Sequence, residues 1–430
     1  MTLSSAGDTI FALSSGAPPA AIAIVRVSGP GAGPALAAIA GSVPEPRRAR
    51  HAALRDDDGA LIDRALLLWM PGPNSATGED LAEFHLHGGR AVVAALFDRL
   101  AGLPGLRSAL PGEFTRRAFL HGRIDLTEAE GLADLLSAET AGQHRRALRM
   151  AEGGLGRIIE RWRSVLLGLS AQIEAAIEFG ESDEEVGTAI RIDGALAELA
   201  GEAKALLAAP PAERLRDGLR IVAAGPPNSG KSTLINALAG REVALATPIA
   251  GTTRDIIEAP VRLDGHAILL TDTAGLRDGA EEVERLGIAR ARNAIDGADL
   301  ILWCGAPEDC PAPDRSLLLH TRADERSDVA PVGSLGVSIH DPNSLIALRR
   351  SIDAKAHLLA GPDDALSLNA RQRALVGTIA EELAVASSML DPILQAEHLR
   401  ICRDALDRLV GRSGVEDMLD SLFGRFCLGK

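Results

Sequence analysis

The spacing of apolar and polar residues changes several times along the chain, and each change indicates a different kind of element. In the first 120 residues, the segments TIFALSS, AIAIVRVSG and DLAEFHLHG have the short apolar runs and the alternation of strands. The segment RAVVAALFDRL, which follows Gly88 and Gly89, has the wider spacing of a helix. The first part of the chain is therefore predicted to mix strands with helices.

The middle of the chain predicts two further kinds of domain. From about residue 124 to 214 the pattern is that of long helices rich in Ala, Leu, Glu and Arg. Residues 218–358 alternate apolar runs with helical stretches, as parallel α/β domains do, and after GPDD (361–364) the helical pattern returns. Because a domain whose ends lie close together can be inserted into another, we expect a multidomain fold. It comprises an α/β domain (1–121), an all-α domain in two pieces (122–215 and 359–430), and an inserted α/β domain (216–358).

Composition limits the class of protein. The chain has 430 residues, 46% of them hydrophobic and 24% charged, which are the values of a globular protein. No apolar run is as long as a membrane-spanning helix and the N-terminus does not have the pattern of a signal peptide, so we expect a cytoplasmic protein with no membrane partner. The cysteines have neither CxxC spacing nor a zinc-binding spacing with histidine. They are Cys304, Cys310, Cys402 and Cys427.

The net charge of −14 repels a polyanion at long range. A nucleic acid would therefore have to be bound by local basic clusters or through another protein. The candidate clusters are RRAR (47–50), HRRALR (144–149) and GRIIERWR (156–163). Such clusters also occur on the solvent faces of ordinary helices, and this alternative is favoured for each of them.

The segment RIVAAGPPNSGKSTLINAL contains the strongest motif. An apolar strand (219–223) leads into Gly225-x-x-x-x-Gly230-Lys231-Ser232, and a helix follows. This is a P-loop in its proper context. The glycines let backbone amides turn toward a β-phosphate, Lys231 reaches the β- and γ-oxygens, and Ser232 is a ligand for Mg²⁺.

Two segments downstream of the P-loop fit a GTPase. IIEAPVRLDGHAILLTDTAG predicts a hairpin with a turn at Asp264-Gly265. Its second strand ends in Asp272-Thr273-Ala274-Gly275, where Asp272 would hold the magnesium shell and the Gly275 amide would contact the γ-phosphate. TPIAGTTRD (247–255) would supply a hydroxyl ligand for magnesium, and we prefer Thr253 over Thr252.

The base-reading motif, usually Asn-Lys-x-Asp, occurs here only as TRAD (321–324). Asp324 can accept both guanine N–H groups, and Arg322 can stack on the base with its planar cation. Thr321 is shorter than asparagine and is expected to make a weaker contact. Ser338 in GVSIH lies where a second base-contacting loop is expected. These residues favour guanine over adenine.

Leu276, directly after DTAG, stands where Ras-like enzymes have a glutamine that orients the attacking water. Leucine cannot do this, so either hydrolysis is slow without help or another group takes over. Glu281, Glu282 and Glu284 are candidates, although a solvated helix start is the favoured reading of these carboxylates by composition alone.

Taken together, several segments resemble one family. They are GPPNSGKS, TPIAGTTRD, DTAGLRDGAEEVERLGIARAR, PGEFTRRAFLHGRIDLTEAEGLADLL and the tail CLGK. They resemble the tRNA uridine-5-carboxymethylaminomethyl modification GTPases, the MnmE (or TrmE) family, over essentially the whole chain. The P-loop is generic, whereas the N-terminal block and the tail are specific.

The resemblance implies a potassium-stimulated GTPase that dimerises across Ras-like G domains, with K⁺ and Mg²⁺ as cofactors. Asn228, Thr247, Ile249 and Thr252 would bind K⁺, Glu284 would position the water, and Arg254 would lie beside it. The full nucleotide-binding set is then Asn228, Ser229, Gly230, Lys231, Ser232, Thr233, Thr247, Pro248, Ile249, Ala250, Gly251, Thr252, Thr253, Asp272, Thr273, Ala274, Gly275, Thr321, Arg322, Asp324 and Ser338.

The N-terminal domain resembles the family's tetrahydrofolate-binding and dimerisation module. Arg26, Glu83 and Arg123 match the folate-contacting positions, where a carboxylate suits the donor edge of a pterin and arginines suit the glutamate tail. By sequence alone, each would be an ordinary surface or helix-capping charge. The loop SSGAPPAAIAI departs from the family, in which it is rich in glycine and arginine.

The tail Cys427-Leu428-Gly429-Lys430 matches the family's Cys-x-Gly-Lys ending. Gly429 would let the backbone pack closely, Lys430 would contact the folate, and Cys427 would lie beside the one-carbon donor and the wobble uridine. Neighbouring Lys430 and Arg425 would favour the thiolate. The residues alone favour an inert cysteine, and with the resemblance the role could be nucleophile, acid or structural.

The resemblance also implies partners. The protein would be a homodimer that works with the FAD- and NADH-dependent protein MnmG (glucose-inhibited division protein A) in a heterotetramer or larger complex. Together they would add a (carboxymethyl)aminomethyl group to C5 of the wobble uridine of certain tRNAs, using 5,10-methylene-tetrahydrofolate. The alternatives are an RNA- or ribosome-associated switch GTPase without covalent chemistry, and a free-standing one-carbon enzyme with a regulatory G domain.

Overall fold

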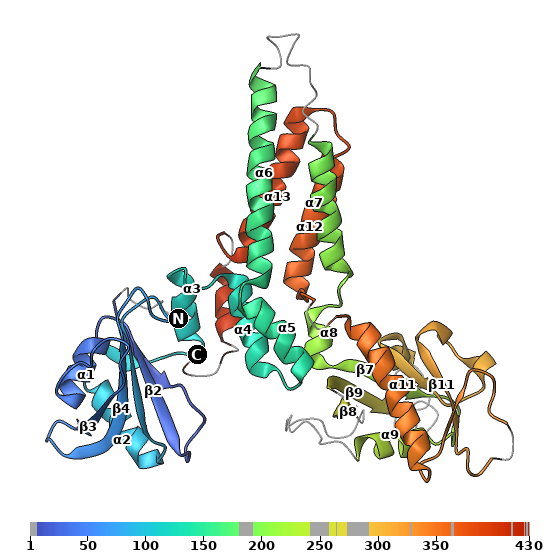
Figure 1. The fold of residues 1–430 in the computed structure, drawn as a ribbon, viewed down its shortest axis with the longest axis horizontal. Helices are drawn as coiled ribbons and strands as arrows, with labels where there is room; N and C mark the ends of the chain where they lie inside the picture. The colour runs from blue at the N-terminus through green and yellow to red at the C-terminus, as the bar shows by residue number, and fades with distance from the viewer. Residues whose placement is uncertain are drawn as a thin grey trace, which may run out of the picture. The chain divides into compact units, whose positions relative to one another are not determined.

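The computed structural model describes residues 7–179, 192–240, 258–263, 265–272, 292–326, 329–362, 365–413, 416–424, 426 and 429. The chain divides into two compact units (Figure 1). The first comprises Met1–Ala133 with Asp407–Lys430, and the second comprises Asp134–Leu406. Both ends of the chain therefore belong to the first unit.

The first unit is built on a six-stranded sheet with the order β3-β4-β5-β2-β1-β6. All neighbouring strands are antiparallel except β1 and β6, which are parallel. The strands are β1 (Thr9–Leu13), β2 (Ile22–Ser28), β3 (Arg50–Arg55), β4 (Leu61–Met70), β5 (Leu81–His87) and β6 (Leu106–Ser108).

Alternate side chains of this sheet pack on its two faces, as the period of a strand requires. One face carries the main core with Phe11, and is covered by α1 (Ala32–Ala40) and α2 (Arg90–Ala101). The other face carries Ile10 and Leu81, which pack on Phe114 of α3 (Glu113–Leu120). Burial of both faces makes the sheet a rigid frame for the polar residues on its strands.

The C-terminal part of the chain returns to this unit. Helix α14 (Glu416–Phe423) contributes Leu419 and Phe423 to a cluster that also contains Leu126 of α4 (Leu126–Ser137) and Phe426. A Cβ added to Gly112 would lie 2.2 Å from the Phe423 carbonyl oxygen, so the two backbones are in direct contact there. Leu419, Phe423 and Phe426 are thus part of the core of the first unit.

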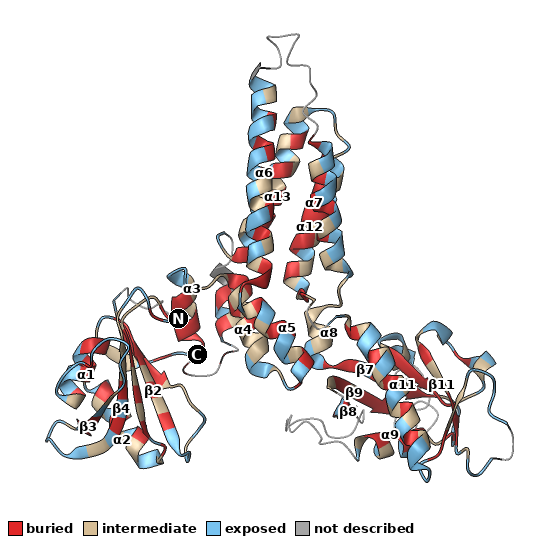
Figure 2. Cartoon of the chain, in the orientation of Figure 1, coloured by how far each residue is buried: buried red, intermediate tan, exposed pale blue. Residues whose placement is uncertain are grey.

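The second unit contains a group of long helices whose buried faces are turned toward one another (Figure 2). Trp162 is buried, and its indole N–H donates to Glu202 Oε2 at 2.6 Å, which joins α6 to α7. The helices are α5 (Ala141–Ala151), α6 (Gly154–Phe179), α7 (Asp193–Ala208), α8 (Ala212–Asp217), α12 (Ala370–Ala386) and α13 (Pro392–Val410).

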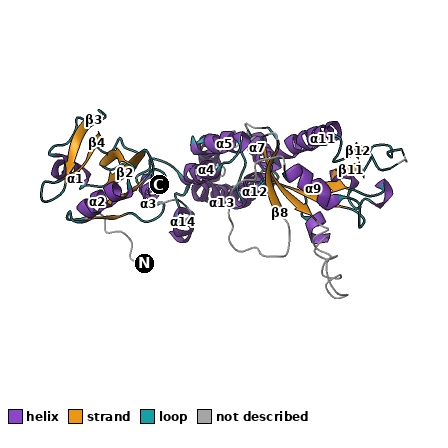
Figure 3. Cartoon of the chain, turned by 90° about the horizontal axis from the view of Figure 1, so that it is seen from below, coloured by secondary structure: helices purple, strands orange, loops and turns teal. Residues whose placement is uncertain are grey.

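The second unit also contains a six-stranded sheet, with the order β12-β11-β10-β7-β9-β8. All pairs are parallel except β8 and β9, which form the predicted antiparallel hairpin. The strands are β7 (Leu219–Ala224), β8 (Glu258–Leu263), β9 (His266–Asp272), β10 (Leu300–Trp303), β11 (Ser316–Thr321) and β12 (Leu335–Val337). Strands therefore occur in two separate groups along the chain, one sheet in each unit (Figure 3).

Helices pack on both faces of the second sheet. Ile221 lies on the face of the sheet that is covered by α9 (Lys231–Ala239) and α11 (Pro342–Ala360). Val222 lies on the opposite face, where it packs with Ile301 and Ile295. Short 3₁₀ turns, η2 (Pro307–Asp309) and η3 (Pro313–Arg315), lead from β10 to β11. This is the layered arrangement of a parallel α/β domain.

The predicted fold class is confirmed. The chain has an α/β N-terminal part and an inserted α/β part that carries the P-loop. Helical segments precede and follow the inserted part in the sequence. The sequence patterns did not indicate β3, β4, β6 and α1. The division at residues 121, 215 and 358 stays a prediction. Among the described residues, no helix is long and apolar enough to cross a membrane.

Candidate functional site

A cavity of about 670 Å³ lies at the edge of the second sheet where the parallel strands end. The P-loop follows β7, the TRAD segment begins at the last residue of β11, and GVSIH continues past β12. Loops at this edge of a parallel sheet are where such folds bind ligands. The cavity is lined by Asn228, Gly230, Lys231, Ser232, Thr233, Leu234, Thr321, Arg322, Asp324, Glu325, Val337, Ile339 and His340.

The P-loop backbone has the conformation that phosphate binding needs. Gly225 has φ +144°, and a Cβ there would lie 2.9 Å from the Cys304 backbone, so only glycine fits. Asn228 and Gly230 have φ of 62° and 86°, and α9 begins directly after Gly230. Two left-handed residues before a helix N-terminus direct successive amides into one concave site, which suits an anion.

Lys231 lies almost fully buried at the inner end of this site. Its ammonium group donates to the Pro226 carbonyl oxygen at 2.6 Å and to Ser229 Oγ at 3.4 Å. Asp272, at the end of β9, is 3% exposed and lies beside Ala223 in the strand register. Burial raises the pKa of the neighbouring Cys304 thiol to about 12. The positive charge of Lys231 acts against this shift, and the negative charge of Asp272 adds to it. The thiol therefore stays neutral.

The base-reading end is tied to the phosphate end by a hydrogen bond. Thr321 Oγ1 donates to the Ser229 carbonyl oxygen at 2.6 Å, and both residues are buried. Arg322 has φ 56°, and its Nε donates to Glu325 at 2.8 Å. The hydrogen bond from Ser338 lowers the pKa of Asp324, so this carboxylate is ionised at neutral pH and acts as an acceptor.

Five residues that line this cavity are not in the predicted nucleotide-binding set: Leu234, Glu325, Val337, Ile339 and His340. Leu234 and Val337 belong to the helix and the strand that flank the predicted loops. Glu325 is three residues after Arg322, a spacing at which an ion pair could have been anticipated. His340 follows the predicted Ser338 by two residues, and its amide donates to Ser338 Oγ at 3.0 Å. Ile339 gives no signal, because an isolated apolar residue in a loop has no specific meaning.

In the first unit, the structure brings together two of the predicted folate-binding residues. Arg26 of β2 lies directly across from Glu83 of β5, and its Nε and Nη2 donate to Glu83 Oε1 at 3.1 and 2.8 Å. His85 contacts the other carboxylate oxygen at 3.1 Å, and the Arg26 guanidinium lies 5.9 Å from the centre of the Phe114 ring. Burial raises the pKa of Glu83, but the Arg26 and His85 interactions outweigh it and lower the pKa overall.

Arg123 is exposed just beyond α3, and its side chain passes close to Gly78. Hydrogen bonds thus join Arg26 to Glu83. Among the described contacts, none joins Arg123 to these two residues.

The end of the chain contacts the end of β1. Gly429 is buried with φ +89°, and a Cβ there would lie 2.2 Å from the Leu13 carbonyl oxygen. Ser14 Oγ donates to the Gly429 carbonyl oxygen at 2.9 Å. This contact explains why the penultimate residue is a glycine. Arg425, Cys427 and Lys430 lie outside the described residues.

Comparison with known proteins matches both parts of this architecture. The family described as GTP-binding protein TrmE N-terminus matches residues 9–123, and the MnmE helical domain matches residues 126–427. The tRNA modification GTPase MnmE of Rhizorhabdus wittichii is 54% identical over 99% of this chain and 97% of its own length. The proteins of the same name from Novosphingobium aromaticivorans and Zymomonas mobilis are 51% and 47% identical, each over 98% of this chain and 100% of their own length.

The chain belongs to the MnmE family of tRNA modification GTPases. The family resemblance noted in the sequence is thereby confirmed. The nucleotide-binding cavity is the part of this MnmE-family chain in which GTP hydrolysis would take place.

Several residues that the family resemblance singled out lie outside the described residues. They include the proposed water-positioning Glu284, with Leu276, Glu281 and Glu282 near it in sequence. The segment that would ligate both metal ions is also outside. The nucleotide-binding predictions affected are Thr247, Pro248, Ile249, Ala250, Gly251, Thr252, Thr253, Thr273, Ala274 and Gly275, and the catalytic prediction affected besides Glu284 is Arg254.

The basic clusters considered for RNA binding in this MnmE-family chain are largely engaged in contacts within the chain. In HRRALR, Arg146 is only 7% exposed and binds backbone carbonyls, so it cannot belong to a surface patch. In GRIIERWR, Arg161 pairs with Glu202. In RRAR, Arg47 donates to the Asn74 carbonyl oxygen. These contacts favour the structural alternative for the three arginines.

Proposed function

We propose that this MnmE-family chain hydrolyses GTP to support the modification of transfer RNA, the activity for which its relatives are named. The observation that carries the proposal is the cavity in which a P-loop, the ammonium group of Lys231 and the ionised carboxylate of Asp324 face one space. A phosphate chain suits one end and a guanine edge suits the other.

At the phosphate end, Lys231 would exchange its contacts with Pro226 and Ser229 for the β- and γ-phosphate oxygens. Ser232 lines the cavity and Asp272 is a buried carboxylate at the adjacent strand end, so the donors present are the oxygens that Mg²⁺ prefers. Bound magnesium would neutralise charge on the phosphates.

The hydrolytic step itself is proposed to depend on K⁺ and on Glu284. The left-handed conformation and exposure of Asn228 leave its amide oxygen able to ligate a monovalent cation at the rim of the P-loop. Thr247, Ile249 and Thr252 would complete that site, and Thr253 would ligate magnesium. Because Leu276 cannot orient water, Glu284 would hold it, with Arg254 nearby.

Potassium dependence can be tested by GTP hydrolysis in K⁺ and in Na⁺ at equal ionic strength. We expect much faster hydrolysis in K⁺, and equal rates would remove the assignment to Asn228. In the same assay, Glu284→Ala should bind GTP normally but hydrolyse it roughly two or more orders of magnitude more slowly. Equal loss in binding and hydrolysis would indicate a structural role for Glu284.

The first unit is proposed to bind a tetrahydrofolate, with 5,10-methylene-tetrahydrofolate as the one-carbon donor. The chemistry of Arg26 and Glu83 fits such a ligand. The Glu83 carboxylate is ionised, and because both Arg26 donors bind Oε1, its other oxygen, Oε2, keeps an acceptor site beside His85 for a pterin edge, while Arg26 holds the carboxylate in place. Arg123 and Lys430 would bind the anionic tail of the folate.

The proposed product is a wobble uridine that carries a (carboxymethyl)aminomethyl group at C5, formed together with MnmG. Contact between Gly429 and β1 supports a role for the tail, because it anchors the residue two positions after Cys427. Reconstitution with MnmG, tRNA and the folate should yield the modified base in the wild type and not in Cys427→Ser. If Cys427→Ser modifies tRNA normally, Cys427 has no role in the chemistry. If neither protein yields the modified base, the RNA-associated switch GTPase becomes the better hypothesis.

We further propose a homodimer that forms through the first unit and associates with MnmG in the cytoplasm. Light scattering of the pure protein should give twice the mass of one chain without nucleotide. A monomer under these conditions would contradict the proposal.

A further inference from the structure

The inserted α/β segment is attached to the helices at two points, and both attachments contact α5. The chain enters the segment through α8, directly before β7, and leaves it at the end of α11. Two residues of α5, Gln143 and Arg146, are one turn apart and reach one attachment each.

Gln143 holds the end of α8. Its Nε2 donates to the carbonyl oxygens of Leu215 and Arg216, both at 3.0 Å. A helix of only six residues leaves most of its carbonyls without partners inside the helix, so these two bonds satisfy groups that α8 cannot satisfy itself. The same side chain accepts, through Oε1, the amide hydrogens of Glu139 and Thr140 in the capping box of α5.

Arg146 holds the end of α11. Its Nη2 donates to the carbonyl oxygens of Ala360 and Gly361 at 3.2 and 2.9 Å, and the side chain is 7% exposed. A buried cation at a helix C-terminus is favourable because it faces the negative end of the helix dipole. Arg146 therefore supplies both the hydrogen bonds and the charge that the end of α11 requires.

Both attachments are themselves firmly joined to the second sheet. Arg214 of α8 forms an ion pair with Asp299, whose other carboxylate oxygen accepts the Arg220 amide hydrogen of β7 at 2.9 Å. Helix α11 packs on the sheet through Leu348 and Ile352, which are buried in its core. A displacement of the sheet would therefore move the two groups that Gln143 and Arg146 hold.

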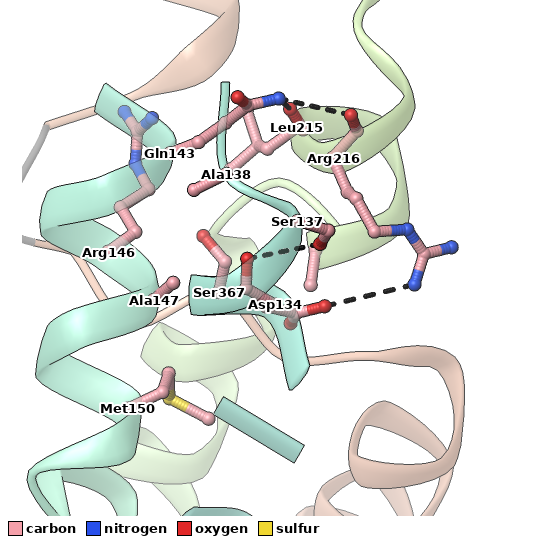
Figure 4. Close-up of a pocket in the computed structure, with 11 residues that line it drawn as sticks. Asp134, Ser137, Ala138, Gln143, Arg146, Ala147, Met150, Leu215, Arg216 and Ser367 are labelled. Carbon is pink, nitrogen blue, oxygen red and sulfur yellow. Dashed lines mark hydrogen bonds and ion pairs between the residues drawn. The ribbon is translucent and has the colours of Figure 1, made fainter. Parts of the chain in front are cut away.

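The contact between α5 and the attachments combines these polar contacts with apolar side chains, among them Ala147, Met150 and Leu215, and it is incompletely packed (Figure 4). A cavity of about 40 Å³, enough for one or two water molecules, lies beside Gln143, Arg146 and Ser367. Ser367 Oγ is buried and has no hydrogen-bond partner in the described part of the chain. Other contacts also hold α8, such as the Ala212 amide hydrogen on the Leu368 carbonyl oxygen and the ion pair of Arg216 with Asp134. Because packing at this joint is incomplete, the hydrogen bonds of Gln143 and Arg146 contribute to fixing its geometry.

We propose that Gln143 and Arg146 are positioning residues that transmit the nucleotide-dependent state of the inserted segment to the helical part of the chain. The inference rests on the proposed function in that the transmitted state is set by GTP. It assigns to α5 the coupling between GTP hydrolysis and tRNA modification. Neither Gln143 nor Arg146 lines the nucleotide-binding cavity.

The substitution Gln143→Glu separates this role from the folding of α5. A glutamate keeps the oxygen that accepts the Glu139 and Thr140 amide hydrogens, since glutamate is itself a preferred residue at this position of a capping box. It loses both donors and places a negative charge against the Leu215 and Arg216 carbonyl oxygens. Arg146→Met removes the other contact while keeping the apolar part of the side chain, and Arg146→Lys restores a charged donor.

We expect Gln143→Glu and Arg146→Met to hydrolyse GTP within about twofold of the wild type, while modified tRNA formed per GTP falls tenfold or more; Arg146→Lys should recover part of this loss. The matched control is Arg373→Met. Arg373 of α12 donates to the Leu207 and Ala209 carbonyl oxygens at the end of α7, which is the same chemistry within the helical part. It should lower the melting temperature comparably and leave the ratio of modified tRNA to GTP unchanged.

Hydrogen–deuterium exchange makes the inference testable even if tRNA modification itself is not observed. In the wild type, a non-hydrolysable GTP analogue should change the exchange of peptides from α5, and in Gln143→Glu this change should be lost although the analogue still binds. An identical response of α5 in both proteins, or wild-type coupling in both α5 variants, overturns the inference. Absence of modified tRNA in the wild type would instead count against the proposed function.

Discussion

The contact of Gly429 with β1 gives a quantitative prediction for Gly429→Ala. The φ of +89° is a left-handed conformation, which costs an L-residue about 1–2 kcal/mol. The new Cβ would also lie 2.2 Å from the Leu13 carbonyl oxygen, so the backbone must move away. That movement breaks the hydrogen bond from Ser14, worth about 1 kcal/mol. The sum, about 2–3 kcal/mol, reduces the docked tail roughly 30- to 150-fold relative to the undocked tail.

Two measurements check this prediction. Hydrogen–deuterium exchange of the C-terminal peptide should become faster in Gly429→Ala, and formation of modified tRNA should fall by at least tenfold while GTP hydrolysis is unchanged. Ser14→Ala removes only the hydrogen bond and should have a smaller effect. Gly105→Ala is the control, because Gly105 has φ +76° but open space around it, so it bears the conformational cost without a contact. Wild-type exchange and tRNA modification in Gly429→Ala would refute the reasoning.

Three further predictions follow from the described contacts. Thr321→Val removes the hydrogen bond to the buried Ser229 carbonyl oxygen, and a lost buried hydrogen bond costs about 1–2 kcal/mol. The Kd for GTP, measured by titration calorimetry, should therefore rise about 5- to 30-fold. An unchanged Kd would show that the bond does not support binding. Asp324→Asn places an amide donor against guanine donors and should weaken GTP about 100-fold while favouring xanthosine triphosphate, whose C2 carbonyl accepts; retained preference for GTP would argue against this orientation of the base. The pKa of Glu83 is lowered from 4.5, so its ionised form stabilises the folded state above pH 4.5, and this stabilisation is lost as the pH falls through the folded-state pKa. In this acidic range, the melting temperature should depend less on pH in Arg26→Met than in the wild type. Equal slopes would exclude the ion pair as the cause.

The sequence predicts most reliably the features that are fixed by local chemistry. A P-loop requires glycines at a set spacing between a strand and a helix, and the structure has β7, Gly225, Gly230 and α9 in this order. The hairpin of β8 and β9 was equally clear because a two-residue turn separates two apolar runs. In β4, by contrast, Asp63 and Arg64 interrupt the apolar pattern, and the strand is recognisable only through its partners β3 and β5.

Contacts between distant residues set the limit of the prediction. Arg146 looked like part of a basic surface because its partners lie 214 and 215 residues away in sequence. Arg26 and Glu83 could each be matched to a family position, but their pairing follows from the register of β2 and β5, which the alternating pattern alone does not determine.

The position of both chain ends in one unit has a consequence for biosynthesis. The core that contains Leu126 also requires Phe423 and Phe426, and these are synthesised later than every residue of the second unit. The second unit, Asp134–Leu406, is fully translated before they appear. Domains generally fold as they emerge, so the segment between the two ends should fold first, and a nascent chain stalled before residue 416 should carry a first unit whose hydrophobic surface is still open to chaperones.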